Sequence, residues 1–417
     1  MTTSEPSTLS LPPLLSSSTP PTPQQTSPLC TLPAELRTEI FTYALSPYED
    51  NDPSTAYQKD TFWRRPGYSA PKRTSTALLQ TCKAIYAETW FMPFALAEHI
   101  MYLTAHERAP KTTVKTREAR LDIQRSLTEI RKLYGSVESG DLRIFAQLYM
   151  LEPGDLLQGI LDRAFLMPRL VRLTIRYTDF WHWEQRQPLY IDSRWVNEVR
   201  IPDSVTRFVM DFESLERRKD EVDILAKQAI EGWFFTRKDG RVLTASMEVA
   251  VSRWTGSSMF ASRRWVRDES RPGELDYYVA TVTWKLASST EGLDLETPRP
   301  KIRVPDDFVQ TPPLFTEAVT VGEDEMQSAE ATMEMSAGET LAAIRERQAE
   351  RRANMGPRRL RTRRPAATQD RGNNAASPAD LFTTNRPAQP QRPTSTLLDT
   401  FSGLAIVSRF PEDLFNS

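Results

Sequence analysis

The placement of proline constrains this chain more than any other feature. The 417 residues include 31 prolines, which cluster in residues 1–33 and again from about residue 298 onward. Stretches of this kind bury too little apolar surface to offset the entropy lost when the chain is ordered. We therefore expect residues 1–28 to form a disordered Ser/Thr/Pro-rich tail and residues 305–417 to form a second disordered tail. The segment between them is long enough to bury a sizeable core.

The second tail is acidic first and basic afterwards. Nine acidic residues and no Lys or Arg lie between Val304 and Ile344, whereas Arg345 to Arg364 contains nine arginines and two glutamates. A helix is expected at 336–353. The end of the basic part is interpreted either as a nuclear-import signal or as a solvated tail. No aromatic residues alternate with the arginines for base stacking, so a nucleic-acid partner is not expected. The arginines at the end of the basic part are Arg358, Arg359, Arg361, Arg363 and Arg364.

Cysteine usage and hydropathy predict the compartment. The two cysteines, Cys30 and Cys82, form neither a CxxC pair nor a zinc-ligand spacing, which favours a reducing compartment. No apolar run approaches the ~20 residues that span a bilayer. The first residues also lack the basic region of a secretory signal. We expect a protein of the cytoplasm, the nucleus or both, with no membrane partner and no cofactor.

Hydrophobic periodicity predicts helices in the first part of the foldable segment. Pro33 suits the first turn of a helix, and an apolar stripe follows it until Pro47. A second helix is expected from Ser75 to about Pro93, and three more at 114–134, 137–150 and 155–166. The stripe of the first helix consists of Leu36, Ile40, Phe41, Ala44 and Leu45.

The period changes to that of strands after residue 166. Strands are expected at 170–177, 205–212, 242–251 and 277–286, and an amphipathic helix at 215–234. The sequence thus predicts an α+β fold, in which a helical portion at 29–100 precedes an α+β body at 101–304. The body is expected to hold a small β-sheet with a covering helix.

No catalytic or metal-binding motif is found, and the three histidines do not cluster with cysteines, so we expect a protein that is not an enzyme. One stretch is dense in aromatic and charged residues, and three interpretations of it stay open. It forms a partner-recognition patch, it lines a pocket in which His182 acts as a general base between carboxylates, or its rings only cap a strand end. Its members are Asp179, Trp181, His182, Trp183 and Glu184.

Two segments resemble those of fungal F-box-like proteins. Residues 32–41, Leu-Pro-Ala-Glu-Leu-Arg-Thr-Glu-Ile-Phe, are similar to the opening helix of an F-box. Residues 78–88, Leu-Leu-Gln-Thr-Cys-Lys-Ala-Ile-Tyr-Ala-Glu, are similar to a later helix common in that group. The stretch from Leu173 to Asp211 also looks like the C-terminal half of uncharacterised members.

This resemblance implies a protein that binds a Skp-type adaptor of a cullin-type ubiquitin ligase through its N-terminal helices and recruits a target through the remainder. The residues implied to face the adaptor are Leu32, Pro33, Leu36, Ile40, Leu79, Cys82 and Ile85. Residues 46–74 separate the two segments more widely than in an F-box. The alternative is therefore a nuclear scaffold or regulator, whose F-box-like helices are only structural and whose tails bind partners.

Overall fold

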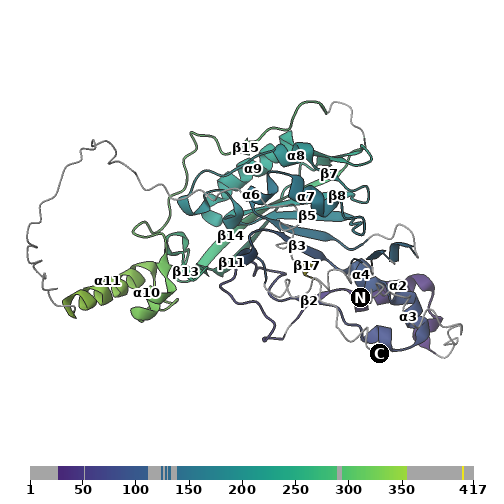
Figure 1. Cartoon of the computed structure of the whole chain (residues 1–417), viewed down its shortest axis with the longest axis horizontal. Coiled ribbons are helices and arrows are strands. Elements are labelled where there is room, and N and C mark those ends of the chain that lie inside the picture. The colour runs from purple at the N-terminus through teal and green to yellow at the C-terminus, as the bar shows by residue number, and fades with distance from the viewer. Residues whose placement is uncertain are drawn as a thin grey trace, which may run out of the picture.

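The computed structural model describes residues 27–50, 52–110, 124, 127–128, 130–132, 139–288, 294–354 and 406–407. A ten-stranded mixed sheet organises this part of the molecule (Figure 1). Its order is β17-β3-β4-β5-β8-β14-β10-β9-β7, and β11 also pairs with β14. The strands are β3 (His99–Leu103), β4 (Leu142–Ala146), β5 (Leu170–Ile175), β7 (Arg200–Ile201), β8 (Arg207–Leu215), β9 (Phe234–Arg237), β10 (Val242–Ala245), β11 (Ala250–Ser257), β14 (Glu274–Leu286) and β17 (Ile406–Val407).

Four neighbouring strands, β3, β4, β5 and β8, run parallel. Parallel neighbours need crossover connections, and crossovers of one hand leave their helices on one face of the sheet. The crossover helices are α6 (Leu148–Leu151), α7 (Asp155–Leu161) and α8 (Arg194–Glu198). Figure 1 shows them on one side of the strands together with α9 (Lys219–Gly232), which follows β8 and packs on β8 and β14.

The two faces of the sheet differ in chemistry, because successive side chains of a strand point to opposite faces. On β5, Val171, Leu173 and Ile175 enter the large apolar core beneath the helices. Arg172, Thr174 and Arg176 alternate with them and lie on the other face. The same alternation on β8 sends Asp211 and Glu213 to that second face, which is therefore charged.

Residues 57–73 and smaller elements cover the charged face. Tyr68 packs there against Ile100, Tyr102 and Phe145, and a second aromatic cluster forms around Tyr177.

The short strands are β1 (Tyr48–Glu49), β2 (Lys72–Arg73), β6 (Tyr190–Ile191), β12 (Met259–Phe260), β13 (Arg263–Arg264), β15 (Ile302–Arg303) and β16 (Val321–Gly322). The 3-10 turns are η1 (Ala77–Gln80), η2 (His106–Arg108), η4 (Tyr177–Asp179), η5 (Trp183–Gln185), η6 (Glu216–Arg218) and η7 (Val266–Asp268).

The N-terminal helices form a separate small cluster beside the sheet (Figure 1). They are α1 (Pro28–Thr31), α2 (Ala34–Leu45), α3 (Lys83–Thr89) and α4 (Met92–Leu96). Phe41 and Leu45 of α2 are fully buried against Leu79, Ile85 and Met92. The segment between α2 and η1 leaves this cluster and covers the charged face, so the helices keep their own core.

The structure confirms a mixed α+β fold, but it corrects the expected size of the sheet and one helix. The helix expected at 137–150 is wrong, because Leu142–Ala146 is the fully buried strand β4. A strand buried on both faces lacks the alternation that marks a half-buried strand. The strand expected at 242–251 is split into β10 and β11, which pair with successive parts of β14. Most of the expected helix at 114–134 lies outside the described residues.

The ordered part of the chain also extends beyond residue 304. Residues 305–354 include β16, α10 (Glu323–Ser328) and α11 (Ala337–Asn354), which pack on a cluster around Val266 and Val321. The expected helix at 336–353 is confirmed by α11. The buried Arg264 binds Glu269 and also donates to the carbonyls of Thr332 and Met335. The expected disorder of 305–354 is thus wrong, because a buried arginine in the body binds this polar segment.

Candidate functional site

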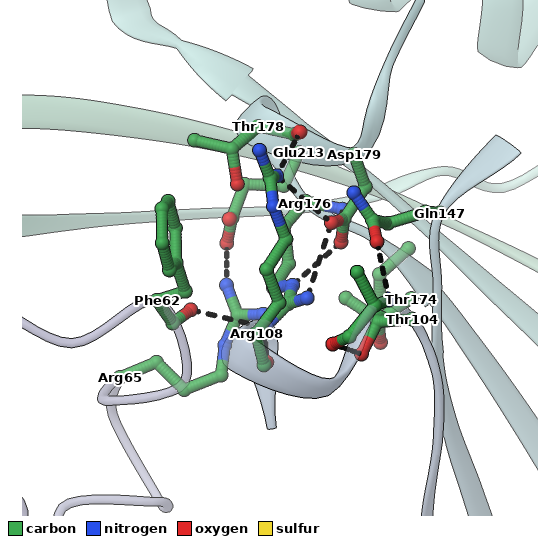
Figure 2. Close-up of polar contacts among 12 residues, drawn as sticks. Phe62, Arg65, Thr104, Arg108, Gln147, Thr174, Arg176, Thr178, Asp179 and Glu213 are labelled. Carbon is green, nitrogen blue, oxygen red and sulfur yellow. Dashed lines mark hydrogen bonds and ion pairs between the residues drawn. The ribbon is translucent and has the colours of Figure 1, made fainter. Parts of the chain in front are cut away.

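A network of buried ion pairs lies on the charged face of the sheet (Figure 2). Arg65, from the segment between α2 and η1, donates to the carboxylate of Glu213 on β8, and both side chains are almost fully buried. Arg176, at the end of β5, binds Asp179, with 3.1 Å between Nη2 and Oδ1. The Nη1 of Arg176 also donates to the carbonyl of Phe62 at 3.0 Å. The network therefore joins residues that are far apart in the sequence.

A second part of the network is centred on Asp211. Its Oδ2 accepts hydrogen bonds from Thr174 Oγ1 at 2.8 Å and from Arg143 Nη2 at 3.2 Å. Its Oδ1 accepts from Thr281 Oγ1 at 2.8 Å. Four neighbouring strands, β4, β5, β8 and β14, thus supply one side chain each.

An open cleft of about 910 Å³ lies beside this network. Trp254 of β11 stacks on Tyr277 of β14, with 4.1 Å between ring centroids, and forms one wall. Phe62, Arg65 and Glu213 also line the cleft. The indole Nε1 of Trp254 donates to Glu213 at 3.0 Å. We call this site the arginine cleft, defined by Phe62, Arg65, Glu213, Trp254 and Tyr277. Its volume is within the range of ligand pockets.

Positive and negative charges balance among the buried groups here. Arg65, Arg143 and Arg176 lie with Asp179, Asp211 and Glu213, and the partly buried Arg108 lies 3.7 Å from Asp179. Burial lowers the pKa of Arg108. The charge of Asp179 raises this pKa, but it offsets burial and the repulsion from Arg176 only in part. Burial also opposes the charge of Arg65, but the pKa of Arg65 is raised because Glu213 outweighs that effect.

The aromatic stretch at 179–184 does not form one pocket. Asp179 is buried and bound by Arg176, and Trp183 is buried in the cluster around Tyr177. Trp181 is half-buried and donates through Nε1 to Glu152 at 2.8 Å. His182 and Glu184 are exposed, and His182 has a left-handed backbone with φ 52°. The arrangement therefore does not bring His182 between the two carboxylates that a general-base role requires.

The residues expected to face an adaptor divide into two groups. Leu36 and Ile40 of α2 are 48% and 42% exposed, Pro33 is exposed and Leu32 is partly buried. Leu79 and Ile85 are buried in the helical cluster, and Cys82 is partly buried against it. The apolar residues of α2 thus form two faces rather than one stripe, with Phe41 and Leu45 inward and Leu36 and Ile40 outward.

Sequence reasoning missed Tyr43, Arg65 and Trp254. Tyr43 is 78% exposed and extends the outward face of α2 by one turn. The aromatic and basic run Phe62-Trp63-Arg64-Arg65 is a signal that could have pointed to Arg65, but its partner Glu213 lies 148 residues further on. No local spacing connects residues so far apart. The arginine run at 358–364 lies outside the described residues.

The described residues contain no group of His, Cys, Asp and Glu side chains placed to hold a metal ion. No helix in that part of the chain has the length and hydropathy of a membrane-spanning segment. Comparisons with protein-family profiles, curated proteins and solved structures find no match for the chain.

Proposed function

We propose that this chain is an F-box-like interaction protein, which binds a Skp-type adaptor of a cullin-type ubiquitin ligase through the outward face of α2 and recruits a target through its α+β body. The observation that carries the proposal is the exposed apolar row of Leu36, Ile40 and Tyr43 on a helix whose opposite face is fully packed. Burying a fully exposed Leu or Ile side chain contributes about 1.5–3 kcal/mol, and about half of that remains for Leu36 and Ile40, which are already about half buried.

The two F-box-like segments also contact each other directly. Arg37, in the first segment, forms an ion pair of 3.1 Å with Glu88, in the second. The Nη1 of Arg37 donates to the carbonyl of Leu32 at 2.6 Å, which ties the start of α2 to the same pair. The second segment therefore supports α2 from behind, and Leu79 and Ile85 contribute to the proposed interface by fixing the helix rather than by touching the adaptor.

Co-purification of the full chain with the Skp-type adaptor of its host tests the proposal. We expect the unmodified chain to retain the adaptor and the double variant Leu36→Asp/Ile40→Asp to lose it. The variant is expected to stay folded, because both side chains project away from the helical core.

A matched control replaces two exposed aliphatic residues far from α2. Val309 and Leu314 are 88% and 80% exposed, so Val309→Asp/Leu314→Asp adds the same charges without touching α2. This control is expected to bind like the unmodified chain. Failure of the unmodified chain to bind contradicts the proposal and favours the alternative, a nuclear scaffold or regulator that binds partners through its tails.

A further inference from the structure

Strand β11 forms an edge of the sheet and runs along the arginine cleft. Its eight residues pair with β14, and no described residue pairs with its other side. In an antiparallel pair every second residue points its backbone N–H and C=O away from the partner strand. Ala250 to Arg253 are all exposed, whereas Trp254, Gly256 and Ser257, which line the cleft, are partly buried. Such an edge accepts a further strand through main-chain hydrogen bonds.

The side chains of β11 connect this edge with the cleft. Trp254 pairs across the sheet with Tyr277, on the face that carries Glu213. Gly256 follows on the same face, and a Cβ there would lie 2.6 Å from the Trp254 ring. The absence of a side chain at Gly256 thus lets the indole lie flat beside the cleft. A strand added to β11 would place alternate side chains over this wall.

The network beneath the cleft contains unpaired buried donors, and one of them belongs to Arg65, which lines the cleft. Arg65 donates to Glu213 through Nη2, but its buried Nη1 has no hydrogen-bond partner within the described part of the chain. An unmet buried donor costs about 1–3 kcal/mol, more for a charged group. A carboxylate from a ligand supplies this acceptor.

The chain's own acidic stretch is already placed elsewhere. Residues 321–344 form β16, α10 and part of α11, and they pack on the cluster around Val266. Met333 and Glu334 of this stretch line the cleft, as do Asp60 and Glu274 from other segments. Within the described part of the chain Glu213 is the carboxylate that binds Arg65, so an acceptor for its Nη1 is left for another molecule to supply.

We propose that the arginine cleft and the free edge of β11 form one binding site for an extended peptide that carries a carboxylate. The peptide adds to β11 as a strand, its carboxylate meets Arg65, and its neighbouring side chains contact Phe62 and Trp254. This inference rests on the target-recruiting role proposed above. Peptide binding does not require the adaptor, however, so failure of one experiment leaves the other interpretable.

The test begins with a random library of peptides of about ten residues, the length of a long strand, panned against the full chain. We expect enriched peptides to share one acidic position within an alternating apolar pattern. An enriched peptide is then synthesised with Glu or Gln at that position, and with a free or an amidated C-terminus. The Glu form is expected to bind at least about tenfold tighter than the Gln form. The two C-terminal forms show whether a side chain or the terminus supplies the carboxylate.

Two further comparisons test the geometry. Two forms of the peptide are made, one methylated at the odd and one at the even backbone nitrogens, and these are the two N-methylated registers. One of the two forms is expected not to bind, because its methyl groups block the hydrogen bonds to β11. The variant Arg65→Gln/Glu213→Gln, which removes both charges of the pair, is expected to erase the preference for Glu. The control Arg237→Gln/Asp239→Asn alters another ion pair, on β9, and is expected to preserve the preference. The proposal is overturned if no peptide is enriched, if Glu and Gln forms bind equally, or if both N-methylated registers bind.

Discussion

At the scale of single residues, Arg65 combines several contacts in a small volume. Its guanidinium lies 5.3 Å from the ring centroid of Phe145 and 5.6 Å from that of Trp254, while Nη2 binds Glu213. Cation–π contacts with desolvated rings and a buried ion pair both favour the charged form. The residue thus joins the segment at 46–74 to the sheet.

Removing one member of this pair is expected to destabilise the protein strongly. Arg65→Gln leaves the carboxylate of Glu213 buried with only Trp254 as a partner, which costs about 3–5 kcal/mol of unfolding free energy. Arg65→Gln/Glu213→Gln removes both charges and is expected to cost less than the single variant. Urea unfolding of the two variants measures the difference. An Arg65→Gln protein as stable as the unmodified one contradicts the buried pair.

Protonation of His99 makes the free energy of unfolding depend on pH. Burial lowers the pKa of His99 to about 4, which the Phe94 backbone and Glu98 oppose only in part. Because the folded pKa lies below the ordinary value near 6.5, the unfolded state binds the proton first as the pH falls. We expect His99 to cost about 2 kcal/mol of stability between pH 7 and pH 5.

Unfolding free energies at the two pH values measure this loss. His99→Leu is expected to show a smaller loss, and His182→Leu, at an exposed histidine, controls for the removal of a histidine elsewhere. An equal loss in His99→Leu and in the unmodified chain rules out the proposed role of His99.

At the scale of elements, α2 has two apolar faces with different roles. Phe41 is fully buried and Leu36 is about half exposed, so we expect Phe41→Ala to cost about 3–5 kcal/mol and Leu36→Ala far less. Hydrogen exchange is the measurement, with lost protection expected in α2 and α3 while β4 and β5 retain theirs. Comparable effects of the two substitutions contradict the division into an inner and an outer face.

The elements with a clear period were predictable from the sequence. The strand at 170–177 and the helices at 155–166 and 215–234 correspond to β5, α7 and α9, because each shows one period over its length. The strands β3 and β4 were missed, because every one of their residues is buried and no alternation remains. The arginine cleft escaped prediction for a different reason, since Arg65, Glu213 and Trp254 meet only when distant strands pair.

At the scale of the whole molecule, Arg264 connects the body with the segment at 332–340. Its side chain is fully buried and hydrogen-bonds Glu269, Thr340 and two carbonyls. Arg264→Leu is therefore expected to expose this segment to a protease that cleaves after glutamate, at Glu334 and Glu339, whereas Arg345→Leu, which breaks an exposed pair with Glu317, is expected to leave it protected. Limited proteolysis with mass spectrometry identifies the cuts. Equal cleavage in both variants contradicts the role of Arg264.

The segment at residues 46–74 connects the two proposed surfaces. Residues 46–74 leave α2, cover the charged face and supply Phe62 and Arg65 to the cleft. This segment thus links the helices proposed to bind an adaptor with the cleft proposed to bind a peptide.

Contact between the outward face of α2 and the adaptor is the central claim, and site-specific photo-crosslinking tests it most directly. A photoreactive phenylalanine derivative is placed at Tyr43, which is 78% exposed beside Leu36 and Ile40, and the full chain is irradiated with the Skp-type adaptor. The same derivative at Val309, which is 88% exposed but far from α2, serves as the control. The account predicts a covalent adduct from position 43 alone. No adduct from position 43, or an equal yield from position 309, would contradict it.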